Sequence, residues 1–193
     1  YTYSISLYGI TPEAYNNWNV NGKWLTKDLS LLVQSGGINK TLDSPRNEFF
    51  NLDFSIDDLE IITMTNAKST RFAGNQSNFR FKIYEQFGVS FLSKLTSAQI
   101  QIQQNSKIPR DIKQQIQALQ CPFLVVIRFY GYDSNGNLVN GSKLGIPETG
   151  SDPGSIVEKW IPFQVADIRY KISTKNVEYK IIATIPQTSI AHG

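Results

Sequence analysis

The sequence predicts a mainly β fold, a mostly antiparallel β-sandwich or barrel with one helical segment packed on it, and three observations support this prediction. Apolar and polar residues alternate with a period of two in several segments, which is typical of half-buried strands. A helical period of 3.6 occurs in the middle of the chain alone. Of the 193 residues, 40% are hydrophobic and 18% are charged, which indicates a packed core rather than a disordered chain.

Four strands are predicted in the first half of the chain, over residues 1–7, 29–33, 50–56 and 79–84. The second of these is a short run that stops at Ser35-Gly36-Gly37, whereas the other three alternate. A polar stretch with buried aromatic residues is expected between the first two strands. Asp57-Asp58 marks a break, after which the apolar residues change phase.

The helical segment is predicted between residues 90 and 121, as two consecutive helices. Ser90 is the expected N-cap of the first helix, and Pro109 suits the first position of the second. Cys121-Pro122 ends the segment, because the residue before a proline avoids helical geometry. The apolar positions are Phe91, Leu95, Ala98 and Ile102 in the first helix and Ile108, Ile112, Ile116 and Leu119 in the second. We therefore expect both helices to lie on a sheet.

The last third of the chain predicts a buried strand, a long loop and a hairpin. Residues 123–129 are almost continuously apolar, as in a strand that is covered on both faces. A long surface loop rich in Gly, Ser, Asn and Pro is expected over 131–159. The apolar phase changes across Ala166-Asp167, which predicts a β-bulge, and a turn at 173–176 joins the two arms of the hairpin. The polar face of this hairpin carries Arg169, Lys171, Glu178 and Lys180.

Domain organisation is predicted to be simple, with one β-rich domain over residues 1–193. No internal repeat and no linker divides the chain. The chain begins at Tyr1, inside an alternating pattern, without an initiator methionine or a signal-like segment. We therefore expect a fragment of a longer polypeptide, or a processed one.

Composition and charge argue against several classes of function. A single cysteine rules out a disulfide framework and a zinc site of thiolates, and a single histidine, His192, argues against a histidine triad. The formal net charge of +3 is too small to predict nucleic-acid binding. No apolar run reaches the roughly 20 residues of a membrane span. No cofactor is predicted.

Two polar clusters could carry chemistry. Asp53, Asp57, Asp58 and Glu60 could supply paired carboxylates for acid–base catalysis or a metal, although a solvated strand edge also explains them. The stretch Asp133–Asn137 spaces its oxygen donors as a calcium loop does. Its glycine falls at the fourth place rather than the sixth, so a turn is the better interpretation.

The remaining candidates are a thiol, an imidazole and a set of aromatic rings. Cys121 starts a strand with no histidine near it in the sequence, which indicates a buried, inert thiol. His192 is expected to be solvated. An aromatic platform for sugars or bases could be formed by Tyr15, Trp18, Trp24, Tyr130 and Tyr132, with packing roles as the simpler explanation.

Three segments together resemble one known family. They are the strand-to-helix join Phe79–Leu95, the strand Phe123–Asp133, and the ending Trp160–Ile172 with Glu178–Ile182. Their order is similar to that of tail-tube-type domains in baseplate hub and related structural proteins of large contractile-tailed bacteriophages. In that family a strand that ends in Glu-Pro-Tyr-Gly runs into a helix, whereas Gln86-Phe87 stands here in place of Pro-Tyr. The resemblance covers most of residues 79–185.

The resemblance implies a non-enzymatic structural protein of the virion, part of a contractile injection system. Such domains assemble by sheet-edge contacts into a ring around a central channel. The implied partners are copies of this chain or other tail and baseplate proteins, with DNA only as passing cargo and assembly in the host cytoplasm. It implies no catalytic residue and no cofactor. The expected interface residues are Arg169, Lys171, Glu178 and Lys180 on the hairpin, and Asp133 and Asn135 on the long loop.

The residues leave two other functions open. The aromatic residues near Trp18 and Trp24 suggest a carbohydrate- or surface-binding β-sandwich module of a tail or cell-surface protein. The acidic group near Asp57 suggests a hydrolase.

Overall fold

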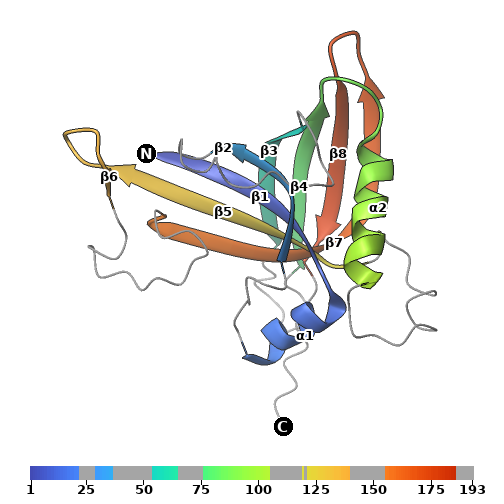
Figure 1. Cartoon of the computed structure of the whole chain (residues 1–193), viewed down its shortest axis with the longest axis horizontal. Helices are drawn as coiled ribbons and strands as arrows, with labels where there is room; N and C mark the ends of the chain where they lie inside the picture. The colour runs from blue at the N-terminus through green and yellow to red at the C-terminus, as the bar shows by residue number, and fades with distance from the viewer. Residues whose placement is uncertain are drawn as a thin grey trace.

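The computed structural model describes residues 1–21, 29–36, 54–64, 76–104, 119, 121–139 and 155–185. This part of the chain contains two helices and eight strands (Figure 1). The helices are α1 (Pro12–Asn21) and α2 (Phe91–Gln104). The strands are β1 (Thr2–Ile10), β2 (Leu29–Gly36), β3 (Phe54–Met64), β4 (Gln76–Glu85), β5 (Phe123–Tyr132), β6 (Leu138–Val139), β7 (Val157–Ile172) and β8 (Val177–Thr184).

The strands form one antiparallel sheet in the order β2-β1-β5-β7-β8-β4-β3, and β6 pairs with β5. The mainly β fold predicted from the sequence is therefore confirmed. Strand β7 divides the sheet, because Val157–Phe163 pairs with β5 and Gln164–Ile172 pairs with β8. We call β2, β1, β5 and Val157–Phe163 the first strand group. The second strand group is Gln164–Ile172, β8, β4 and β3, and it runs across the first (Figure 1).

The core lies between the inner faces of the two strand groups. Phe163 of β7 joins them, since its ring lies 5.2 Å from Phe79, 5.6 Å from Phe81 and 5.7 Å from Phe123, measured between ring centroids. The ends of the sheet also approach each other, because the Ile56 amide in β3 donates a hydrogen bond of 2.6 Å to the Ser35 hydroxyl of β2. The fold is thus a sharply bent sheet that comes close to closing on itself.

Helix α2 packs into this core as its apolar period predicts. Its predicted stripe is fully buried at Phe91, Leu95, Ala98 and Ile102. The second predicted helix, from Pro109, lies outside the described residues except for Leu119. Among the described residues, neither helix is long and apolar enough to cross a membrane.

Helix α1 was not expected from the sequence, which we interpreted as an irregular polar stretch. Thr11 caps it, since its hydroxyl accepts a hydrogen bond of 3.1 Å from the Ala14 amide, and Pro12 stands at the first helical position. Ala14 packs on Leu124 and Val126, on the side of β5 away from α2. The prediction that this strand is covered on both faces is confirmed, with α1 as one of the covers.

Two further expectations are corrected at the strand ends. Strand β3 continues through Asp57-Asp58 instead of breaking there, because a bulge between Asp57 and Glu60 absorbs the change of phase. The predicted loop 131–159 is shorter than expected, since β5 extends to Tyr132, β6 follows it, and β7 begins at Val157.

The bulge predicted at Ala166-Asp167 is confirmed, because the register of β7 with β8 shifts between Val165 and Asp167.

Candidate functional site

The four hairpin residues predicted at an interface lie together on one face of the second strand group. Arg169 is directly opposite Lys180, and Lys171 is opposite Glu178. Lys180 is also opposite Lys82 of β4, so three cations form a row across neighbouring strands. We call this the charged face. The opposite face of the same strands is buried in the core at Phe81, Ile83, Tyr179 and Ile181.

Ion pairs on the charged face link β4 to its neighbours β3 and β8, and a further pair lies within β7. The Lys82 ammonium lies 2.7 Å from a carboxylate oxygen of Asp58 and 3.8 Å from one of Glu178. The hydrogen bond to Asp58 raises the pKa of Lys82 above its ordinary value. The Arg169 guanidinium lies 2.7 Å from a carboxylate oxygen of Asp167. These groups are solvated, so salt screens them and they remain available to a partner.

The acidic residues considered for catalysis lie at the β3 end of the charged face. Asp58, with φ of 50°, sits at the bulge, and its carboxylate is engaged by Lys82. Asp57 accepts a hydrogen bond of 2.9 Å from the amide of Asp58, and Glu60 is exposed. A depression of about 450 Å³ lies beside them, lined partly by Arg80. Asp53 lies outside the described residues.

Asp133 and Asn135 lie apart from the other four predicted interface residues. They form a tight turn after β5, at the opposite end of the molecule from the β7–β8 hairpin (Figure 1). One carboxylate oxygen of Asp133 accepts hydrogen bonds of 2.8 Å from the amides of Asn135 and Asn137. Hydrogen bonds from Asn137 above all lower the pKa of Asp133. The carboxylate therefore stabilises a turn, and the described residues contain no cluster of three or more acidic, Cys or His side chains that could hold a metal ion.

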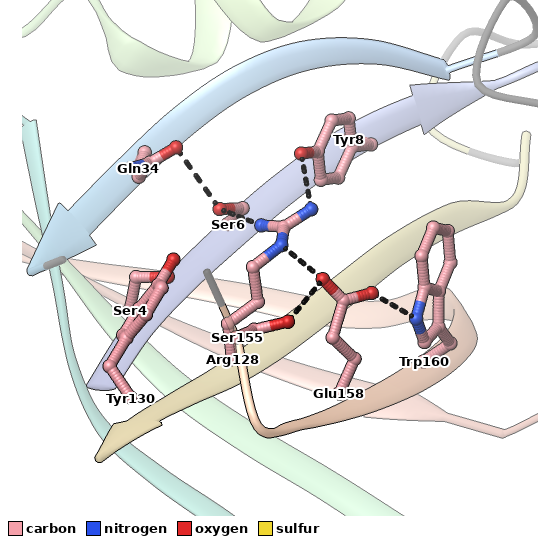
Figure 2. Close-up of polar contacts among 9 residues, drawn as sticks. All are labelled: Ser4, Ser6, Tyr8, Gln34, Arg128, Tyr130, Ser155, Glu158 and Trp160. Carbon is pink, nitrogen blue, oxygen red and sulfur yellow. Dashed lines mark hydrogen bonds and ion pairs between the residues drawn. The ribbon is translucent and has the colours of Figure 1, made fainter. Parts of the chain in front are cut away.

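A buried ion pair on the outer face of the first strand group was missed by the sequence analysis. Arg128 Nε donates a hydrogen bond of 2.9 Å to Glu158, and the side chains are only 5% and 3% exposed (Figure 2). Ser6 and Tyr8 accept further hydrogen bonds of 3.0 Å from the guanidinium. The Trp160 indole donates to the second Glu158 oxygen at 2.9 Å. The sequence feature that could have indicated this network is the charged Arg128 inside the otherwise apolar run 123–129.

The environment of Arg128 keeps it charged. Burial lowers the pKa of its guanidinium, but Tyr8 and Glu158 outweigh burial and raise it. The pair links β1, β5 and β7 through side chains that are almost fully buried.

A second buried carboxylate, Glu85, caps helix α2. It accepts hydrogen bonds from the Ser90 amide and hydroxyl, from the Phe91 amide, and from the Tyr179 hydroxyl at 2.8 Å. Burial opposes its ionisation, yet the hydrogen bonds from Ser90, Tyr179 and Phe91 hold its pKa below the ordinary value. Ser90 is at the predicted N-cap position, but the capping acceptor is Glu85. Gly88, with φ of 106°, allows the chain to turn between them.

The remaining candidates do not form a site in the described residues. Tyr130 is fully buried, with its hydroxyl 3.3 Å from that of Ser4, so it cannot belong to an exposed aromatic platform. Trp18 packs on Tyr15 within α1, whereas Tyr132 is exposed at the end of β5. Cys121 is buried, and burial raises the pKa of its thiol to about 11, as expected for an inert thiol. Trp24 and His192 lie outside the described residues.

An open strand edge, that of Gln164–Ile172 in β7, is the other feature of this surface. Gln164–Ile172 of β7 pairs with β8 along one edge, and no described strand pairs with its other edge. Strand β3 pairs with β4 alone among the described strands, but its other edge approaches β2, where the Ile56 amide donates a hydrogen bond to the Ser35 hydroxyl.

Comparison of the chain with family models, with curated proteins and with solved structures found no match.

Proposed function

We propose that this chain is a non-enzymatic structural component of a phage tail baseplate hub or tube, which assembles by sheet-edge contacts into a ring around a central channel. Its partners are copies of itself or other tail and baseplate proteins. DNA only passes through the channel. The protein acts in the virion after assembly in the host cytoplasm.

The observation that carries this proposal is the open edge of β7. Residues Arg169, Tyr170, Lys171 and Ile172 are exposed in the second half of β7, which pairs with β8 alone among the described strands. An exposed edge of this kind is a liability for a monomer, because it offers unpaired amides and carbonyls to any other strand. In a ring the same edge becomes the interface. The resemblance of residues 79–185 to tail-tube-type domains supports this interpretation of the edge.

The chemistry of the candidate catalytic groups also supports a structural role. Asp58 is held in an ion pair, Arg128 and Glu158 satisfy each other inside the protein, and Cys121 is a buried thiol. The charged face offers a polar wall toward a water-filled channel, while the other face of the same strands fills the core.

The test is the state of association of the 193-residue chain, measured by sedimentation velocity and electron microscopy. We expect rings or short tubes, alone or on mixing with neighbouring tail proteins, with interfaces of more than about 1,000 Å² each. The proposal would be overturned if the chain stays monomeric at high concentration and binds none of the tail proteins.

Carbohydrate binding is the second candidate, and one observation favours it. Tyr3 of β1 and Phe129 of β5 are directly opposite each other and are 52% and 37% exposed, and the exposed Tyr1 stands just before β1. Exposed aromatic rings in a row suit sugar stacking. A glycan panel tests this: any hit should be lost with Tyr3→Ala and kept with Tyr132→Ala, on the other face of β5. A panel without a hit ends this candidate.

A further inference from the structure

The exposed end of β7, residues 169–172, has a different chemistry on each of its two faces. Arg169 and Lys171 stand on the charged face of the sheet. Tyr170 and Ile172 alternate with them and therefore lie on the other face, where they are 56% and 61% exposed. This end of the strand thus has a basic face and an apolar face, and both are open to solvent.

The apolar face of this segment continues the core beyond the point where the core is covered. Tyr170 is directly opposite Tyr179, which is fully buried, and the two ring centroids lie 6.1 Å apart. Ile172 is directly opposite Val177, which is also buried. The side chains on β8 are therefore covered, whereas their neighbours on β7 are more than half exposed. One more strand beside β7 would give each of them a cross-strand neighbour.

The backbone of this segment is open to such a strand. Gln164–Ile172 pairs with β8 alone among the described strands. The backbone hydrogen bonds of the described turns and loops do not involve this segment either. Amides and carbonyls at a free strand edge form hydrogen bonds with an extended segment of another molecule, which is the mode of binding called β-augmentation.

The exposed charges of this edge select the chemistry of the added strand. The Arg169 side chain is 75% exposed, and its ion pair is with Asp167 of the same strand. Lys171 forms no ion pair with another described residue, and neither does Lys180, which is directly opposite Arg169. Opposite charges on facing positions of two strands are stabilising, whereas like charges are destabilising. The added strand therefore needs acidic residues on the charged face and apolar residues on the other face.

The described strands of a second copy do not offer this pattern at a free edge. Strand β3 has the acidic residues Asp57, Asp58 and Glu60 among apolar ones. Its outer edge approaches β2 of its own chain, however, since the Ile56 amide donates a hydrogen bond to the Ser35 hydroxyl. The complementary strand is therefore expected from a different protein.

We propose that the end of β7 binds, by strand addition, an extended segment of another tail or baseplate protein in which acidic and apolar residues alternate. The acidic side chains lie beside Arg169 and Lys171, and the apolar ones lie beside Tyr170 and Ile172. This inference rests on the proposed function, and it adds the strand that binds and the chemistry of the partner.

Synthetic peptides test this chemistry. The probe is a short capped peptide in which Glu and Val alternate, and the comparison peptides are one of alternating Lys and Val and one with the same Glu and Val residues in separate blocks. Titration calorimetry of the 193-residue chain should show binding of the alternating Glu-Val peptide, with affinity for the other two lower by about tenfold or more. The bound peptide should also slow amide hydrogen exchange in residues 169–172. Equal binding of the block peptide would overturn the inference, because it would show attraction by charge without strand addition.

Charge reversal at the edge gives a second test. The variant Arg169→Glu/Lys171→Glu should prefer the Lys-Val peptide over the Glu-Val peptide, and this gain of binding also requires that the variant is folded. Two matched controls should keep the wild-type preference. Lys180→Glu reverses a charge on the same face but on the interior strand β8, and Phe87→Ser removes an exposed apolar side chain outside the edge. An unchanged preference in the double variant would contradict the inference.

The outcomes separate this inference from the proposed function. If the chain forms rings but binds none of the peptides, the inference fails and the proposed function stands. If the Glu-Val peptide binds but the chain assembles neither alone nor with any tail protein, the proposed function fails. If the chain alone forms rings that the double variant abolishes, the occupant of the edge is a second copy, and the inference of a different partner is wrong.

Discussion

The two strand groups of this protein differ in the burial of their charged side chains. In the first group, Arg128 and Glu158 are buried, and each meets several hydrogen-bond partners within the chain. In the second group, Lys180, Arg169 and Lys171 stand on an exposed face and at an open strand edge. A buried charge must be satisfied internally, whereas an exposed charge can change partners at little cost. This difference supports the proposal that the first group is a scaffold and that the second is the surface for other molecules.

The largest expected effect comes from breaking the buried pair. Arg128→Met leaves the Glu158 carboxylate buried without its cation, so we expect a loss of about 3–5 kcal/mol in the free energy of unfolding. Urea denaturation measures it. The double variant Arg128→Met/Glu158→Leu should recover much of this loss, because no uncompensated charge remains. A single variant as stable as the wild type would contradict the comparison.

The next effect concerns the Glu85 cap of α2. Glu85→Gln removes a charge that accepts hydrogen bonds from four donor groups, and we expect a loss of about 2 kcal/mol in the free energy of unfolding at pH 7. Tyr179→Phe, which removes one donor, should cost less.

The pH dependence of this variant follows from the lowered pKa of Glu85. A carboxylate with a lowered folded-state pKa stabilises the protein above its unfolded pKa of about 4.3, and that contribution is lost as the pH falls through the lower folded value. The difference between wild type and Glu85→Gln should therefore shrink as the pH falls below about 4.3. A difference that stays constant from pH 7 to pH 3 would show that ionisation of Glu85 is irrelevant.

A smaller effect is expected at the start of α1. Thr11→Ala removes the side-chain cap on the Ala14 amide and should cost about 1 kcal/mol, measured by thermal denaturation. Thr11→Ser keeps the hydroxyl and serves as the control. If both variants are equally destabilised, the methyl group rather than the cap is responsible.

The smallest effect is expected on the charged face. Lys180→Met should leave the melting temperature of the monomer unchanged within error, because this exposed side chain has no ion pair with another described residue. A clear loss of stability would contradict this expectation, since it would place the charged face among the structural parts of the protein.

Much of the fold could be predicted because the signal is local. Alternation identified β1, β4 and the hairpin, the change of phase identified the bulge beside Asp167, and the stripe from Phe91 to Ile102 identified α2. Helix α1 was missed because its apolar period is weak, although Thr11-Pro12-Glu13 carries the signals of a helix start.

The buried polar contacts could not be predicted, because they depend on register between distant strands. Nothing in the sequence near Arg128 specifies that Glu158 lies opposite it, thirty residues later. The same holds for the capping role of Glu85 toward Tyr179. The shared face of the four hairpin residues was predictable from alternation.

Strand β7 has a mechanical consequence. Its sixteen residues run as one covalent segment from the ladder with β5 into the ladder with β8. A pull on the hairpin would therefore be transmitted along the backbone, loading several hydrogen bonds with β5 in shear at once instead of opening them singly. In a tube built from such subunits, axial tension would be shared between both halves of each molecule.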